Sequence, residues 1–351
     1  MAEALNDKLL MVSAPPHVNT DVTTNKIMRD VLIALLPAAV WGVFGFGLKA
    51  LLIILVAMVT CQLAEWLSFK VMKSNRKRDN SALLTGLLFA MCLPVNVNLF
   101  VVFIGSIFAI VVVKMFFGGI GNNILNPALA ARVFVGVSFP TQFSNWQPFK
   151  FLTDAVTSAT PLSIFAKART MDGQLEAMQT EVAKLSNWDM LFGLHSGAIG
   201  EGAAFLLILG GIYLLYKKII SWHIPVSYLL SFFVLAVFAY WFSSAGTDFT
   251  MVDPIYQLLS GGLLLGAFFM ATDYVTSPIT KKGQIIFGVG CGVLTFLIRF
   301  YGGYPEGVMY SILFMNLMTP MIEYFTPTSN TAWFRKDQKE KRKQEAEAKT
   351  A

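Results

Sequence analysis

The sequence contains few charged residues for its length. Asp, Glu, Lys and Arg make up 14% of its 351 residues, whereas hydrophobic residues make up 55%. Soluble domains carry about 25% charged residues, so this shortage excludes an ordinary soluble domain and favours a chain embedded in a bilayer. The polar stretch over 1–25 lacks the apolar core and small-residue cleavage site of a signal peptide. We therefore expect the first membrane helix to act as the insertion signal.

Cysteine and histidine are also scarce. The three cysteines, Cys61, Cys92 and Cys291, lie far apart within apolar stretches, and no CxxC spacing occurs. This excludes a disulfide framework and an iron–sulfur or zinc site built from this chain alone, and predicts that the thiols pack as small apolar groups. We also expect no metal site, because the three histidines are as widely dispersed: His17, His195 and His223.

Positive charge is confined to short segments between apolar runs and to the tail. The formal net charge is +6, and five basic residues lie within 70–79. Cytoplasmic loops retain Lys and Arg in this way, so we expect no nucleic-acid partner. If 70–79 lies in the cytoplasm and each expected helix crosses the membrane once, the basic segments 217–218, 281–282 and 335–349 also lie in the cytoplasm. The sequence therefore predicts a multi-pass protein of the bacterial inner membrane, with both termini in the cytoplasm.

Apolar runs long enough to cross a bilayer predict about ten transmembrane helices and an all-α fold. The third, fifth and eighth runs are short or interrupted by Gly and Pro, which is typical of discontinuous helices that line a site. The expected spans lie near 27–46, 50–70, 81–95, 98–117, 126–140, 202–217, 222–243, 255–272, 284–300 and 306–324.

An internal repeat relates the two halves of the chain. The run over 82–90 parallels that over 262–270, and Lys114 before two glycines parallels Arg299 before two glycines. The first copy starts in the cytoplasm and the second outside, which predicts two inverted five-helix repeats. The expected organisation is a cytoplasmic N-terminal segment (1–26), a first repeat (27–140), an extracytoplasmic loop (141–200), a second repeat (201–325) and a basic cytoplasmic tail (326–351).

The most informative stretch of the extracytoplasmic loop is DAVTSAT, over 154–160. It is small and polar, and it ends in Thr160 before Pro161. Proline disfavours helical backbone at the preceding residue, so we expect the Thr160 hydroxyl on an extended, accessible segment. A flavin transferase needs such a site, because the hydroxyl must reach the diphosphate of FAD and form a phosphoester with the FMN half. The alternative is an ordinary Ser/Thr-rich loop.

This stretch resembles the flavinylation motif Asp-x-x-Ser/Thr-Gly/Ser-Ala-Thr, whose final threonine takes FMN through its phosphate. Asp154, Thr157, Ser158 and Thr160 fit the motif, with Ser158 where glycine is commoner. The resemblance implies covalent FMN on Thr160, attached by a flavin transferase.

The resemblance extends over nearly the whole chain, to the family of the D subunit of the Rnf electron-transport complex and its sibling, the B subunit of the sodium-pumping NADH:quinone reductase. The short segment before the first helix favours the Rnf member. The segments that carry the resemblance are 79–86, 118–128, 222–225 and 268–273.

For function, the resemblance implies a flavin-carrying subunit of an ion-translocating ferredoxin:NAD oxidoreductase complex, coupled to Na+ or H+. The partners would be the other Rnf subunits, including membrane subunits and an FMN-bearing subunit on the outer face. Electrons would arrive from that FMN-bearing subunit, reach FMN on Thr160 and pass inward to a second flavin. The isolated chain is expected to be catalytically incomplete, since it has no nucleotide-binding fingerprint and no cluster ligands.

The glycine- and asparagine-rich segment over 118–127 precedes a predicted half-helix. Glycines let backbone approach a ligand, and Asn123 and Asn126 offer paired donors and acceptors. The resemblance implies a non-covalent riboflavin near this element, with Asn123, Asn126 and Thr85 as its candidate ligands. The simpler interpretation is that Asn126 only caps the helix that begins at Pro127.

Acidic residues near the membrane are candidates for ion coupling. Asp273 ends the broken eighth span and is the leading candidate. Asp30 follows Arg29 and could form a simple ion pair with it, and Glu65 could equally pair with Lys70.

Two functions of other kinds compete with the electron carrier. A cofactor-free channel or secondary transporter would have the same inverted halves and broken helices, but it would not need the motif over 154–160. A structural scaffold within a membrane complex would fit the chain if Thr160 carried no modification.

Overall fold

The computed structural model describes residues 23–73, 79–144, 146–149, 160–170, 186–202, 204–244, 253–304 and 306–327. Their regular structure is helical, and no β-strand occurs among them. Within these ranges, four helices are long and apolar enough to cross a membrane: α2 (Thr24–Phe46), α3 (Leu48–Val71), α11 (His223–Ser244) and α14 (Lys281–Tyr301). The predicted all-α membrane fold is confirmed.

The long helices expose large apolar side chains on their outer faces. Phe44 is 67% exposed, Leu48 70% and Trp241 71%. A soluble monomer rarely exposes such surfaces, whereas a helix that is apolar on all sides suits contact with lipid. The interior is apolar too, and Cys61 and Cys291 are buried in it as small packing residues, as predicted.

Several helices are too short to cross a bilayer alone. The half-helices α4 (Ser81–Met91) and α6 (Pro127–Ser138) have 11 and 12 residues, roughly 17 Å each at 1.5 Å per residue. The eighth span is divided into α12 (Pro254–Leu259), α13 (Leu263–Leu265) and the π-helix η3 (Gly266–Met270). The interruptions predicted for the third, fifth and eighth spans are therefore present. α10 (Ala204–Tyr216) is short as well, which was not predicted.

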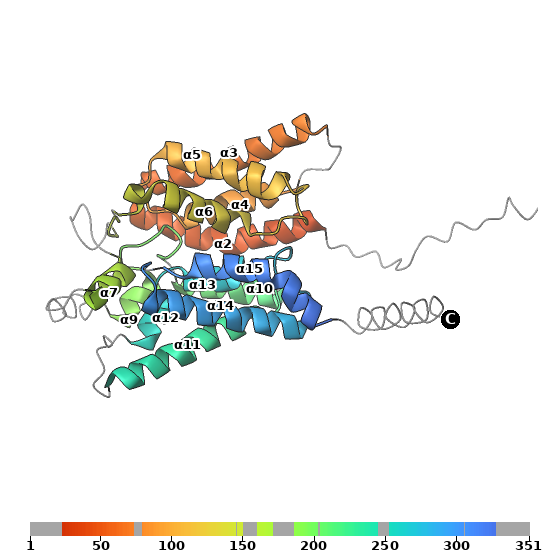
Figure 1. Ribbon diagram of the computed structural model, residues 1–351. Helices are drawn as coiled ribbons and strands as arrows, with labels where there is room; N and C mark the ends of the chain where they lie inside the picture. Colours follow the sequence, from red (N-terminus) through yellow and green to blue (C-terminus); the bar gives the residue numbers. More distant parts are fainter. Residues whose placement is uncertain are drawn as a thin grey trace, which may run out of the picture.

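The helices form two layers, α2 to α6 in one and α10 to α15 in the other (Figure 1). In the first layer, α5 (Leu99–Ile107) and its π-helical continuation η1 (Phe108–Met115) pack on α3 and α6. In the second layer, α14 packs on α11 and α15 (Val308–Phe325). In their order along the chain, α11 corresponds to α3 and α15 to α6. Contacts of α2 with α10 and of α6 with α15 join the layers. This packing agrees with an inverted repeat, while the boundaries of the five expected regions stay a prediction.

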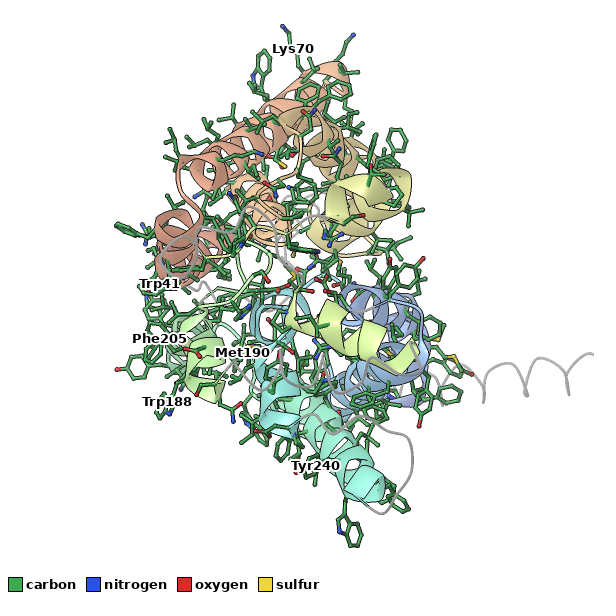
Figure 2. The ribbon with its side chains drawn as sticks, turned by 90° about the vertical axis from the view of Figure 1, so that its left-hand side faces the viewer. Trp41, Lys70, Trp188, Met190, Phe205 and Tyr240 are labelled. Atoms are coloured by element: carbon green, nitrogen blue, oxygen red, sulfur yellow. The ribbon has the colours of Figure 1, made fainter. Side chains whose placement is uncertain are left out.

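Short elements gather at one end of the molecule, opposite the start of α2 and the end of α15 (Figure 1). They are η2 (Pro140–Phe143), α7 (Pro161–Thr170) and α9 (Asn187–Phe192). Trp41 of α2 donates a hydrogen bond from Nε1 to the Phe192 carbonyl at 3.0 Å, and its ring lies 6.2 Å from that of Phe205 in α10. Trp41, Phe205 and Trp188 lie along one side of the molecule in Figure 2. The helix α9 thus covers the junction between α2 and α10.

The segment that connects α9 to α10 enters the protein interior. The Gly200 N–H donates to the Met91 carbonyl at 2.8 Å, and the Ile199 N–H donates to the Leu93 carbonyl at 3.1 Å. Ile199 is fully buried. The expected end of the extracytoplasmic loop at 200 therefore falls within backbone that is packed against the half-helix α4.

Candidate functional site

A cavity lies where the half-helix α4, the segment before α6 and the end of η3 meet, and several polar side chains reach into its largely apolar lining. Its walls include four candidate residues predicted from the sequence, Thr85, Asn123, Asn126 and Asp273, together with Lys114. Its volume is about 80 Å³. The fold therefore brings the candidate riboflavin ligands and the candidate coupling residue to one site.

Asn126 joins the two halves of the molecule at this cavity. Its Oδ1 accepts hydrogen bonds from the N–H groups of Ala128 and Leu129, at 3.0 and 3.4 Å, and so caps α6. Its Nδ2 donates to the carbonyl of Met270, at the end of η3, at 3.2 Å. Capping is therefore one of two roles, because the same side chain also links the first half to the second.

The other two candidate ligands also donate hydrogen bonds within the protein. Asn123 donates from Nδ2 to the Leu125 carbonyl at 3.1 Å, and the Thr85 hydroxyl donates to the Ser81 carbonyl at 2.9 Å. Both side chains are buried. In this conformation their donors hold the backbone around the cavity in place.

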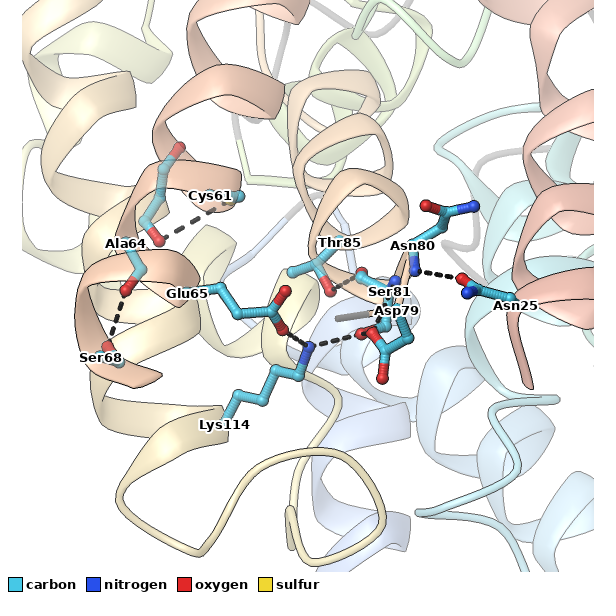
Figure 3. Close-up of polar contacts among 11 residues, drawn as sticks. Asn25, Cys61, Ala64, Glu65, Ser68, Asp79, Asn80, Ser81, Thr85 and Lys114 are labelled. Atoms are coloured by element: carbon cyan, nitrogen blue, oxygen red, sulfur yellow. Dashed lines mark hydrogen bonds and ion pairs between the residues drawn. The ribbon is translucent and has the colours of Figure 1, made fainter. Parts of the chain in front are cut away.

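Lys114, which lines the cavity, forms a buried ion pair with Glu65 (Figure 3). Lys114 Nζ lies 2.5 Å from Glu65 Oε1 and 2.5 Å from Ser81 Oγ. Lys114 is 3% exposed and Glu65 1%. The alternative that Glu65 pairs with Lys70 is wrong. Lys70 lies over the Trp66 ring at 5.3 Å, toward the end of α3, whereas Glu65 faces the interior.

The other two acidic candidates have partners near the ends of helices. Asp30 pairs with Lys217 at 3.2 Å, a contact between α2 and the end of α10, so the alternative of a pair with Arg29 is wrong. Asp273 accepts a hydrogen bond from the Thr276 hydroxyl at 3.3 Å and lines the cavity. Among the three acidic candidates, only Asp273 and the paired Glu65 therefore lie close to the cavity.

Arg299 occupies the position in the second half that Lys114 occupies in the first. Its guanidinium donates to three backbone carbonyls: Gln257 at 2.6 Å, Ser260 at 2.9 Å and Gly261 at 3.2 Å. Lys114 contacts the start of the half-helix α4, and Arg299 contacts the chain that leads into α13. The sequence parallel between Lys114 and Arg299 is matched by these contacts.

Thr160 lies at the start of α7 and is buried, with 5% of its surface exposed. Its Oγ1 accepts the Ser163 N–H at 3.1 Å, and the next residue, Pro161, begins the helix. The expectation of an accessible hydroxyl is therefore wrong for this conformation. The start of α7 packs on the 260–262 break, because a Cβ added at Gly261 would lie 2.0 Å from Leu162 Cδ1. Asp154, Thr157 and Ser158 lie outside the described residues.

Sequence reasoning missed a second buried charge cluster. Arg132 of α6 lies 3.6 Å from a carboxylate oxygen of Glu306 and donates from Nε to the Cys92 carbonyl at 2.8 Å. Glu306 and Glu201 line a small cavity between the two halves. An arginine within an apolar half-helix was the signal that could have found this cluster.

These observations define a class: an all-helical membrane protein whose broken helices surround buried polar sites. The chain belongs to the NQR2, RnfD, RnfE family, whose model matches residues 11–332. This confirms the family resemblance.

Three relatives are similar over nearly their whole length, and each is named as the D subunit of a complex. In Clostridium ljungdahlii the complex is a proton-translocating ferredoxin:NAD(+) oxidoreductase, and the chain is 44% identical to its D subunit over 330 residues, covering 93% of this chain and 97% of that one. In Acetobacterium woodii the complex is a Na(+)-translocating ferredoxin:NAD(+) oxidoreductase, and the identity is 44% over 325 residues, covering 92% and 95%. In Escherichia coli the complex is an ion-translocating oxidoreductase, and the identity is 33% over 349 residues, covering 90% and 96%.

Proposed function

We propose that this chain is the flavin-carrying membrane subunit of an ion-translocating ferredoxin:NAD oxidoreductase complex of the Rnf type. It relays electrons through FMN on Thr160 and through riboflavin, coupled to transport of Na+ or H+ across the inner membrane. The names of the relatives support the complex, since each is the D subunit of a translocating oxidoreductase. One name specifies protons and another Na+, so both ions stay in the proposal.

The observation that carries the flavin assignment is the motif over 154–160 together with the place of its last residue. Thr160 precedes a helix of ten residues, and the partial positive charge at a helix N-terminus favours phosphate. The Ser163 N–H already points at Thr160 Oγ1, and the Ser163 hydroxyl donates to the Thr160 carbonyl at 2.8 Å. The Ser163 N–H and the positive end of the helix fit a phosphoester on Thr160, and FMN held there supplies redox chemistry that side chains lack.

The burial of Thr160 has a consequence for maturation. A flavin transferase acts on an accessible hydroxyl, yet Thr160 is 5% exposed once Leu162 is seated against Gly261. The start of α7 must therefore be undocked while the phosphoester forms. Docking of α7 then follows the attachment.

The convergence of Thr85, Asn123 and Asn126 on one cavity supports a second flavin there. The volume of about 80 Å³ is well below the roughly 300 Å³ at the lower end of small-molecule pockets. Riboflavin does not fit this cavity as it stands. The proposal therefore requires α4 and the segment before α6 to move apart when riboflavin binds.

In-gel fluorescence tests the covalent flavin. The chain is expressed with a flavin transferase, denatured, separated on a gel and viewed under ultraviolet light. We expect a fluorescent band in the wild type and in Thr153→Ala, a matched threonine next to the motif, and no fluorescence in Thr160→Ala. A dark wild-type band, with the transferase active on another substrate, would contradict the electron carrier and favour a cofactor-free transporter.

A further inference from the structure

Glu201 is an acidic side chain that the proposed electron path does not use. It lies in the segment that connects α9 to α10 and enters the interior beside α4. The residue is 9% exposed. Its carboxyl accepts a hydrogen bond from the backbone N–H of Ala198. No hydrogen bond from a side chain to this carboxyl is found among the described residues. A buried carboxylate with so few donors is costly, so this side chain needs another explanation.

Two glycines make the space that the carboxyl occupies. A Cβ added at Gly197 would lie 2.7 Å from one carboxyl oxygen of Glu201, and a Cβ added at Gly262 would lie 3.6 Å from the other. Gly262 also has a positive φ of 66° and stands directly before α13. The carboxyl therefore faces the point where the second half of the molecule breaks its helix.

Glu201 shares a cavity of about 20 Å³ with Glu306. A cavity needs roughly 10–15 Å³ to hold one water, so this one has room for a single water or a single small ion. Other walls come from α4, α6, α15 and the 260–262 break, so both halves contribute. Arg132 lies 3.6 Å from Glu306 and balances one of the two carboxylates. The buried guanidinium of Arg299 also acts on both carboxylates, so two cationic side chains lie near the two acids.

His195 provides a second, independent polar group beside Glu201. It is 5% exposed, its Nδ1 contacts the Ser196 carbonyl at 3.1 Å, and its Nε2 has no partner among the described residues. Its Cε1 lies 3.5 Å from the same Gly197 Cβ position that Glu201 approaches. Burial lowers the pKa of His195 from its usual value.

We propose that Glu201 and Glu306 form a binding site for one monovalent cation, H+ or Na+, with His195 at its side, between the two halves and toward the end where α7 and α9 lie. The site rests on the proposed ion translocation and would be a step of the ion path. The volume of the cavity matches one ion without its hydration shell.

The charges around Glu201 agree with this assignment. Burial, and then the neighbouring Glu306, raise the pKa of Glu201 from 4.5 to about 8, while Arg132 and Arg299 oppose the rise. Cys92 also lines the cavity. At neutral pH the group thus carries a proton, which it can exchange for Na+ by losing H+ to the medium.

Infrared difference spectroscopy of the purified complex tests binding without relying on flavin or on turnover. We expect the carbonyl stretch of a protonated carboxyl to disappear around pH 8 in the wild type, and to be absent in Glu201→Gln. Addition of NaCl at constant pH, with choline chloride as the control salt, separates the ions. Loss of the band with Na+ alone means that Na+ replaces the proton, and an unchanged band means that the site takes H+. The absence of any band that depends on Glu201 overturns the site.

Transport by the complex in liposomes tests the role in the ion path. We expect Glu201→Gln to lower ion uptake per electron at least tenfold, with in-gel flavin fluorescence unchanged. The matched control is Glu323→Gln, at a carboxyl that accepts the Ile279 N–H and lies outside the cavity. Should Glu201→Gln not assemble, Gly197→Ala displaces the carboxyl and should shift the infrared titration. Normal uptake by Glu201→Gln, or an unshifted titration in Gly197→Ala, contradicts the proposal.

Discussion

Each of the buried cations Lys114 and Arg299 contacts partners on other helices or on the segments between them. Lys114 is held by Glu65 and Ser81, and Arg299 by three backbone carbonyls. Each cation stands late in the fourth span of its half, next to a broken helix. Transfer of a charged side chain from water into the protein interior costs several kcal/mol. The contacts of Lys114 and Arg299 offset this cost and hold the backbone at the helix breaks in place.

Replacement of Lys114 by methionine should be strongly destabilising, because it leaves the Glu65 carboxylate buried without its cation. Breaking a buried pair from one side costs about 3–5 kcal/mol. The double variant Lys114→Met with Glu65→Leu should recover more than half of that loss, since no lone charge remains. Denaturant unfolding in detergent, analysed as a double-mutant cycle, measures both values. Additive losses in the cycle would mean that the two side chains do not interact.

The broken helices were predictable because Gly and Pro interrupt apolar runs in the sequence. Pro127 begins α6, with Asn126 as its cap, and Gly261 and Gly262 both have positive φ where α12 ends. The entry of the 193–202 segment beside α4 was not predictable, because its pairing uses backbone groups that every residue carries.

The candidate site was predictable only in part, for a related reason. Asn123 and Asn126 were visible because paired amides are unusual in an apolar sequence, and they do line one cavity. The burial of Thr160 and the pairing of Glu65 with Lys114 depend on contacts between distant helices. Charge and spacing along the chain do not specify such contacts.

Gly261→Ala should undock the start of α7. The added Cβ would lie 2.0 Å from Leu162 Cδ1 at a residue whose φ is +69°, so either the helix or the break must move. Since docking buries Thr160, we expect flavin attachment by a transferase in vitro to become several-fold faster. Gly303→Ala is the matched control, because a Cβ there meets nothing within 4 Å. The time course of in-gel fluorescence reports the rate, and equal rates in both variants would mean that docking does not limit attachment.

The two halves of the molecule meet through polar contacts as well as helix packing. Asn126 bonds the end of η3, the 193–202 segment bonds the end of α4, and Arg132 of α6 reaches Glu306 before α15. A movement between the halves must therefore break or shift these bonds. Both cavities lie at this junction, so their occupants can influence how the halves pack.

The stability of the folded protein should consequently depend on pH through Glu201. Its pKa is raised by folding from 4.5 to about 8, so the folded state binds this proton more tightly than the unfolded state does. By linkage, the stabilisation that this proton gives to the folded state is fully present below about pH 4.5 and is lost progressively as the pH rises to about 8. Above about pH 8 the free energy of unfolding no longer changes through Glu201. Thermal unfolding of the detergent-solubilised chain between pH 5 and 9 should show a falling melting temperature. The fall should be smaller in Glu201→Gln and unchanged in Glu323→Gln. A wild-type profile identical to that of Glu201→Gln would show that folding does not raise the pKa of this carboxyl.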